Sequence, residues 1–193
     1  MVDLRKIAAF HIATPIVIVL SKSRLKPNAL TLTGLGVNLG AAYLVAISHF
    51  SLGGVLILVS GLFDLLDGAL ARFSKQATKF GALLDSTVDR ISEAAILGGL
   101  LVCYVPRVST LEIMLIFAVL IGSFLVSYIR ARAEGLGLEC QVGLFTRVER
   151  VIVLAIGLLL NQVLIALWIL AVFVYITVAQ RLAYLRRQAK NWE

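Results

Sequence analysis

Cysteine and histidine are scarce in this sequence of 193 residues, which has only two of each. Cys103 and Cys140 match no metal-binding spacing and form no paired framework, so a disulfide-stabilised domain and a zinc–thiolate protein are both excluded. His11 and His49 lie far along the chain from the acidic residues discussed below. No internal repeat or low-complexity segment is present either.

Charged residues are also few, at 15% of the chain, whereas 60% of the residues are hydrophobic and the mean hydropathy is +0.97. Soluble domains carry about 45–50% apolar residues. The sequence therefore predicts an all-α integral membrane protein, with residues 1–193 forming one domain. The net charge of +7 comes from basic residues placed between apolar runs, which indicates contact with lipid or phosphate rather than nucleic acid. No cleavable signal peptide is expected, because His11 and Pro15 interrupt the first apolar stretch.

Six apolar segments are read as transmembrane helices, for which about 20 residues are needed, and the fifth of them is marginal in length. They lie near 29–48, 52–72, 81–103, 110–132, 147–161 and 163–184.

Lysine and arginine cluster in alternate connections, which predicts that both termini face the cytoplasm. Residues 1–22 are basic at their start and are followed by more basic residues, so they are expected to form an interfacial amphipathic helix. The alternative is a seventh span, which would place a basic cluster on the outer side.

Four of the five aspartates of the chain lie within one stretch of 28 residues, from Phe63 to Arg90. Asp64 and Asp67 are three residues apart, and Asp85 and Asp89 are four apart. Each pair therefore lies on one face of its helix. The two helices are joined by a short loop, so all four carboxylates are expected to converge near one membrane surface.

Unpaired carboxylates at this depth are costly, so a cation should lie among them. A site made only of carboxylate oxygens suits Mg²⁺ or Mn²⁺ rather than zinc, and four aspartates could hold two such ions. Two-metal sites commonly serve phosphoryl transfer. In the alternative interpretation, the aspartates pair with neighbouring cations: Arg72, Lys75, Lys79 and Arg90.

The stretch reads Asp-x2-Asp-Gly-x2-Ala-Arg-x8-Gly-x3-Asp-x3-Asp from Asp64 to Asp89. All eight fixed positions resemble the signature of the CDP-alcohol phosphotransferase family. The resemblance implies a six-helix membrane enzyme, usually a homodimer, with an interfacial N-terminal helix. Its active site would lie on the cytoplasmic side of the cell membrane, where two divalent ions hold the pyrophosphate of a CDP-linked lipid.

The same resemblance assigns roles to residues. Asp64, Asp67, Asp85 and Asp89 would be metal ligands, and Asp89 would also be the general base. The residues expected to contact the CDP-lipid come from the "PNALTLTG" segment and from the aspartate stretch: Pro27, Asn28, Ala29, Leu30, Thr31, Leu32, Gly68, Ala71, Arg72 and Thr78.

A group of arginines in the second half of the chain predicts an acceptor that itself carries a phosphate, because guanidinium groups bind phosphate in a bidentate manner. The expected acceptor-binding residues are Ser127, Arg130, Arg132, Arg147, Arg150 and Arg181. Membrane orientation is the alternative explanation, and it suffices for Arg186 and Arg187.

The segments "SYIRARAE", "RVER" and "QRL" resemble the phosphatidylinositol phosphate synthases, which join inositol 1-phosphate to CDP-diacylglycerol; archaeal relatives use CDP-archaeol. Three positions depart from their usual form: Arg130 replaces a lysine, Thr146 a glutamate and Val148 a proline. Two alternatives remain open. Glycerol 3-phosphate could be the acceptor, giving phosphatidylglycerol phosphate, or the aspartates could line the pathway of an ion transporter.

Overall fold

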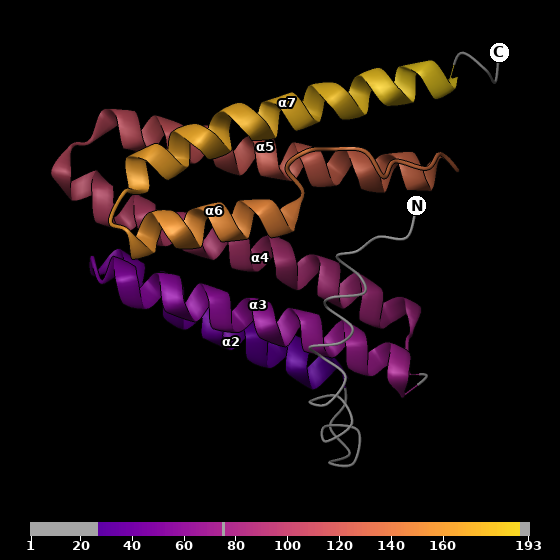
Figure 1. Cartoon of the computed structure of the whole chain (residues 1–193), viewed down its shortest axis with the longest axis horizontal. Coiled ribbons are helices and arrows are strands. Elements are labelled where there is room, and N and C mark those ends of the chain that lie inside the picture. The colour runs from indigo at the N-terminus through magenta and orange to yellow at the C-terminus, as the bar shows by residue number, and fades with distance from the viewer. Residues whose placement is uncertain (1–26, 75, 190–193) are drawn as a thin grey trace.

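The structure is a computed structural model that describes residues 27–74 and 76–189. This part of the chain is all helical, as predicted (Figure 1). Its elements are α2 (Pro27–Ala46), α3 (Phe50–Phe73), α4 (Lys79–Tyr104), the short 3-10 helix η1 (Val105–Arg107), α5 (Thr110–Gly135), α6 (Arg147–Leu159) and α7 (Val163–Ala189). The predicted interfacial helix over 1–22 lies outside the described residues.

Each of the six predicted apolar segments coincides with one of these helices. Four helices, α2, α3, α5 and α7, are long and apolar enough to cross a membrane, so the chain is a membrane protein. Helix α4 is long but contains Asp85, Asp89, Arg90 and Glu93. Helix α6 has only 13 residues, so it is about 20 Å long, which is shorter than a typical hydrocarbon core.

The helices pack side by side in a closed ring. Helix α2 packs against α3 and α4, α4 against α5, α5 against α7, α7 against α6, and α6 against α3. Figure 1 shows α2, α3 and α4 on one side of the molecule, α5 and α7 on the other, and α6 between them. Although α3 and α4 are consecutive in the chain, α2 rather than α4 is the main partner of α3.

Glycines allow the close helix crossings in this ring. A Cβ at Gly99 of α4 would overlap the backbone carbonyl of Ala42 in α2. A Cβ at Gly54 of α3 would come within 2.9 Å of the carbonyl oxygen of Ala155 in α6. Small residues at such crossings are typical of membrane helices, whose association depends on close packing.

The apolar core occupies the inside of the ring and draws side chains from all six helices. Its fully buried members include Val45, Ile57, Leu97, Leu100, Ile116, Leu158 and Leu167. The charged side chains described below gather toward one end of this core, where α3 and α5 end and α4 and α6 begin.

Candidate active site

Three aspartates converge between α3 and α4. Asp64, Asp67 and Asp85 each offer a carboxylate oxygen, and these oxygens lie within 4.8 Å of one another. Ligand oxygens across a hard divalent cation are about 4–5 Å apart, so the cluster fits Mg²⁺ or Mn²⁺. Asp67 is only 5% exposed, and a buried carboxylate of this kind needs a compensating partner.

The hydroxyl of Thr31 holds one of these ligands. Thr31 Oγ1 donates a hydrogen bond of 2.6 Å to Asp67 Oδ2, and it also lies 3.2 Å from the carbonyl oxygen of Pro27 one turn earlier. The bond joins the start of α2 to α3. We predicted Thr31 as a CDP-lipid contact, and the structure gives its hydroxyl a bond to a candidate metal ligand.

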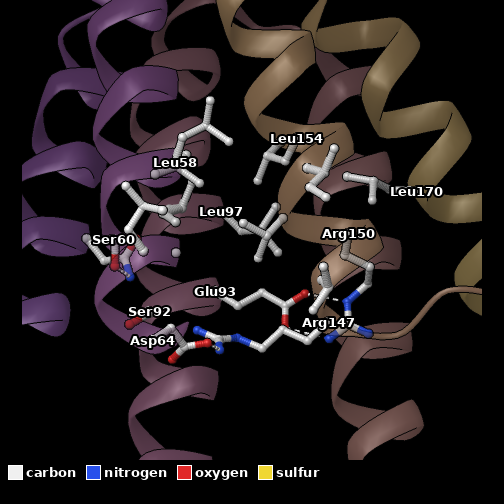
Figure 2. A pocket seen from close by; sticks show the side chains of 18 of the residues that line it. Leu58, Ser60, Asp64, Ser92, Glu93, Leu97, Arg147, Arg150, Leu154 and Leu170 are labelled. Carbon is white, nitrogen blue, oxygen red and sulfur yellow. Dashed lines mark hydrogen bonds and ion pairs between the residues drawn. The ribbon is translucent and has the colours of Figure 1, made fainter. Parts of the chain in front are cut away.

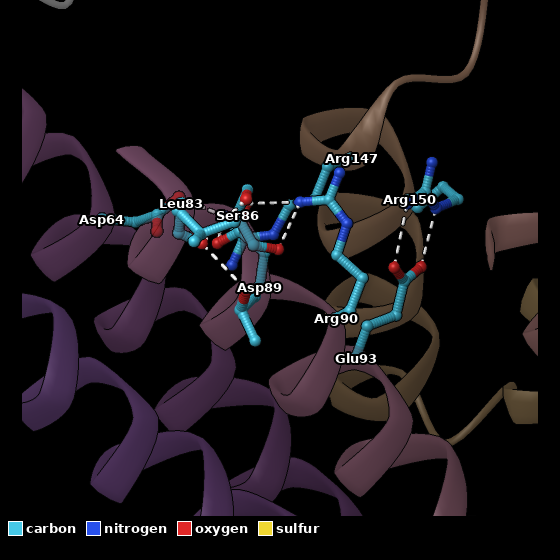
Figure 3. Close-up of polar contacts among 9 residues, drawn as sticks. Asp64, Leu83, Ser86, Asp89, Arg90, Glu93, Arg147 and Arg150 are labelled. Carbon is cyan, nitrogen blue, oxygen red and sulfur yellow. Dashed lines mark hydrogen bonds and ion pairs between the residues drawn. The ribbon is translucent and has the colours of Figure 1, made fainter. Parts of the chain in front are cut away.

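Asp89 lies beside the cluster and contacts arginine. Arg147, the first residue of α6, forms ion pairs with Asp64 Oδ2 and with Asp89 Oδ1, the second at 2.6 Å (Figure 3). Arg90 lies 3.6 Å from the other oxygen of Asp89. Arg147 thus joins the aspartates of α3 and α4 to α6, which places a predicted acceptor-binding residue directly against two predicted metal ligands.

The start of α6 explains how Arg147 reaches this position. Thr146 is the N-cap of the helix, and the carboxylate of Glu149 accepts a hydrogen bond from the Thr146 backbone N–H at 2.9 Å. This capping box fixes the first turn of the helix. The threonine that replaces the usual glutamate of the resembling synthases is therefore a good helix N-cap.

A second acid–base pair lies one turn deeper in the bundle, and its acidic member was not predicted from the sequence. Glu93 of α4 accepts two hydrogen bonds from Arg150 of α6, from Nε at 2.7 Å and from Nη2 at 2.9 Å (Figure 3). Arg150 Nη1 also lies 3.4 Å from the carbonyl oxygen of Phe145. All three guanidinium nitrogens of Arg150 therefore have protein acceptors. The only signal in the sequence was that Glu93 follows Asp89 by four residues.

The other predicted acceptor-binding residues lie on α5 and α7. Arg130 forms an exposed pair with Glu134 at 2.8 Å, and Arg132 is also exposed. Ser127 is half-buried. Arg181 is buried and donates hydrogen bonds to the backbone carbonyls of Val142 and Val126, so it ties the α5–α6 connection to α5 and α7.

Several predicted CDP-lipid contacts lie at the starts of α2 and α4 and near the end of α3. Thr78 is the N-cap of α4 and accepts a hydrogen bond of 2.9 Å from the Gly81 backbone. A Cβ at Gly81 would lie 3.2 Å from Oδ1 of Asn28, so the starts of α2 and α4 meet here. The guanidinium of Arg72 lies over Gly68, where a Cβ would be 3.5 Å from Nη1.

The remaining predicted CDP-lipid contacts differ from one another in solvent exposure. Leu30 is buried against Leu70, whereas Ala29 and Leu32 are exposed. Pro27 begins α2 and is half-buried, as is Ala71 near the end of α3.

An internal cavity of about 220 Å³ extends from the charged groups into the bundle (Figure 2). All six helices contribute to its lining, which is mostly apolar. Its charged lining residues are Asp64, Glu93, Arg147 and Arg150. Side chains of α4 and α6 face each other across part of this cavity, among them Glu93 and Arg150.

Comparison with known proteins agrees with this geometry. Residues 24–182 match the family model described as CDP-alcohol phosphatidyltransferase. An archaetidylinositol phosphate synthase of Pyrococcus horikoshii is 40% identical over 156 residues, which cover 80% of each chain. A phosphatidylinositol phosphate synthase of Mycobacteroides abscessus is 34% identical, over 91% of this chain and 84% of that protein.

Two solved structures of a Mycobacterium tuberculosis phosphatidylinositol phosphate synthase are also similar, each with a TM-score of 0.80 and 35% identity. One has CDP-DAG bound, and the match covers 90% of this chain and 92% of that one. The other is in complex with manganese and citrate, with coverage of 89% and 87%. The family match, the helical fold and the aspartate cluster agree, and the chain belongs to the CDP-alcohol phosphatidyltransferase family.

Proposed function

We propose that this protein transfers a phosphatidyl-type group from a CDP-linked lipid to inositol 1-phosphate, with release of CMP. The donor lipid is CDP-diacylglycerol or CDP-archaeol. The observation that carries the proposal is the contact of Arg147 with Asp64 and Asp89. A cation that can bind an acceptor phosphate lies directly beside carboxylates that can hold the metal of a pyrophosphate donor. The similar proteins named as inositol phosphate lipid synthases favour inositol phosphate over glycerol 3-phosphate.

The donor side of the site consists of Asp64, Asp67 and Asp85, with Asp89 as a further ligand to the second of two divalent cations, Mg²⁺ or Mn²⁺. When bound, such ions neutralise negative charge on the pyrophosphate. Asn28, Gly68, Arg72 and the other predicted CDP-lipid residues would contact the nucleotide and headgroup. This assignment is supported by the position of these residues near the aspartates, where α2, α3 and α4 come together.

The reaction is a displacement at the lipid-side phosphorus. Asp89 accepts the proton of the acceptor hydroxyl, whose oxygen forms a bond to that phosphorus. The bond from the phosphorus to the bridging oxygen of the pyrophosphate breaks, and CMP leaves with that oxygen. Arg147 orients the acceptor through its phosphate, and Arg130 and Arg132 add positive charge nearby on α5.

The proposal includes six transmembrane helices, α2 to α7, and an interfacial helix over residues 1–22. Both termini and the active site face the cytoplasm. The distribution of lysine and arginine supports this topology. We further propose that the protein is a homodimer in the cell membrane, as the family resemblance implies.

An assay of substrate choice tests the function. Purified protein is supplied with a CDP-lipid, Mg²⁺ and a panel of labelled alcohols, and CMP release is measured. Inositol 1-phosphate should be used, and unphosphorylated inositol should not. Equal rates with both would contradict the phosphate pocket, whereas preference for glycerol 3-phosphate would retain the pocket and change the product. Transport of metal ions without CMP release would identify the transporter alternative, which the confinement of the carboxylates to one end of the bundle disfavours.

A further inference from the structure

Glu93 and Arg150 form a buried ion pair that the proposed chemistry does not use. Arg150 is 3% exposed, and the Glu93 side chain is 12% exposed. The bidentate bonds of 2.7 and 2.9 Å join α4 to α6. A charged pair this deeply buried fixes the relative position of the elements that carry it, because separating it would leave two charges without partners.

The pair is in register with the active site. Glu93 follows Asp89 by four residues on α4, and Arg150 follows Arg147 by three on α6, so each residue lies one turn from its active-site counterpart. The Asp89–Arg147 and Glu93–Arg150 pairs therefore form two successive links between the same two helices (Figure 3).

Helices α4 and α6 are not direct backbone neighbours, although side chains of both, such as Leu97 and Leu158, belong to the shared apolar core. Helix α6 packs against α3 and α7, and α4 packs against α2 and α5. The cavity lies between α4 and α6, and both Glu93 and Arg150 line it (Figure 2). At the charged end of the bundle, the long side chains of these ion pairs join α4 to α6.

We propose that Glu93 is a positioning residue for the acceptor site: it holds Arg150, and through the first turn of α6 it places Arg147 against Asp64 and Asp89. Arg150 in this arrangement is a structural partner of Glu93 rather than a ligand of the acceptor phosphate. The kinetic part of the test rests on the proposed function, and the distance measurement does not.

The kinetic test compares Glu93→Gln with Glu112→Gln, the same change at the opposite end of the bundle, in the first turn of α5. Loss of a charge-assisted link should displace Arg147, so Glu93→Gln should raise the KM for inositol 1-phosphate about tenfold or more. The KM for the CDP-lipid should change much less, and Glu112→Gln should match the parent. An unchanged or lower acceptor KM in Glu93→Gln would overturn the proposal, because a released Arg150 would then be serving as the phosphate ligand.

A double variant separates the two roles of Arg150. If Glu93 and Arg150 act as one unit, Glu93→Gln combined with Arg150→Gln should be no more impaired than Arg150→Gln alone. If instead the rise in acceptor KM in the double variant equals the product of the rises in the two single variants, Arg150 contacts the acceptor independently and the proposal is wrong.

A distance measurement tests the positioning without substrate. Nitroxide labels at the exposed residues Ile91 of α4 and Val148 of α6, in a Cys103→Ala, Cys140→Ala background, report the separation of the two helices. Glu93→Gln should broaden or lengthen the distance distribution, and Glu112→Gln should leave it unchanged. A distance distribution in Glu93→Gln identical to that of the parent would overturn the proposal. This outcome is independent of which acceptor the enzyme uses and of whether Arg150→Gln folds.

Discussion

The hydroxyl of Thr31 lies 2.6 Å from Oδ2 of Asp67 and joins the start of α2 to a candidate metal ligand on α3. Thr31→Val removes this donor while preserving side-chain shape, so Asp67 should lose part of its orientation. A hydrogen bond to a charged group contributes about 1.5–3 kcal/mol, and we expect a loss of roughly tenfold or more in kcat/KM and weaker Mn²⁺ binding.

Thr33→Val is the matched control, because the Thr33 hydroxyl is exposed and bonds to the carbonyl of Ala29 in its own helix at 2.8 Å. Thr31→Ser should retain most of the activity. Equal losses in Thr31→Val and Thr33→Val, measured by CMP release, would show that the bond to Asp67 has no special role.

Asp64, Asp67 and Asp85 should each be indispensable for metal binding. Changing any one of them to Asn keeps the shape but removes a charge from a cluster whose oxygens lie within 4.8 Å. We expect transfer to be abolished and Mn²⁺ binding, followed by electron paramagnetic resonance, to fall strongly, while the protein stays folded in detergent. Activity close to that of the parent in any two of these variants would be inconsistent with the site.

Asp89→Asn should behave differently, because Asp89 lies beside this cluster and pairs with Arg147. Its main loss should be the proton acceptor, so turnover should fall strongly while Mn²⁺ binding falls less than in Asp64→Asn. Mn²⁺ titrations of the two variants decide the matter: equal losses would argue against a separate role as base.

Arg147→Gln should have opposite effects on the two halves of the site. The acceptor KM should rise on the order of tenfold to a hundredfold, because a charge-assisted contact to phosphate is lost. Mn²⁺ should bind more tightly, because a positive charge in contact with Asp64 and Asp89 is removed. Arg186→Gln, in the last turn of α7, is the control. Weaker Mn²⁺ binding in Arg147→Gln would contradict this account.

Two adjacent glycines of α4 should respond in opposite ways to substitution by alanine. At Gly99 the new methyl would overlap the carbonyl of Ala42, and overpacking costs about 1–3 kcal/mol. At Gly98 the new methyl would have no atom of another described helix within 4 Å, so alanine should be neutral or stabilise the helix by about 0.5–1 kcal/mol. Thermal unfolding in detergent should give a lower Tm for Gly99→Ala only, and similar Tm values for both variants would contradict the observed α2–α4 crossing.

The sequence predicted the helices well because apolar length and helical period are local properties. All six predicted segments are helices, and α6 differs mainly in ending at Leu159, before a turn in which Asn161 adopts a left-handed φ of 55°. Of the four carboxylates expected to converge, Asp64, Asp67 and Asp85 form the cluster, whereas Asp89 lies beside it and contacts Arg147.

The contacts that the sequence did not reveal join residues far apart in the chain. Glu93 and Arg150 are separated by 57 positions, and Thr31 and Asp67 by 36. No periodicity relates such residues, because their meeting depends on how the ring of helices closes. The contact of Arg147 with two aspartates likewise depends on where α6 packs in the ring, and the sequence of α6 alone does not reveal that position.

The four aspartates discussed above lie on the consecutive helices α3 and α4, whereas the arginine that meets them begins α6 in the other half of the chain. The two halves of the chemistry are therefore encoded in separate stretches of the gene. Under the proposed function, exchange or drift of the C-terminal helices would change which alcohol is recognised, while the two helices assigned to the CDP-linked lipid stay intact. Chimaeras that join residues 27–104 of this chain to the second half of a relative with a different acceptor would be a direct way to engineer new headgroups.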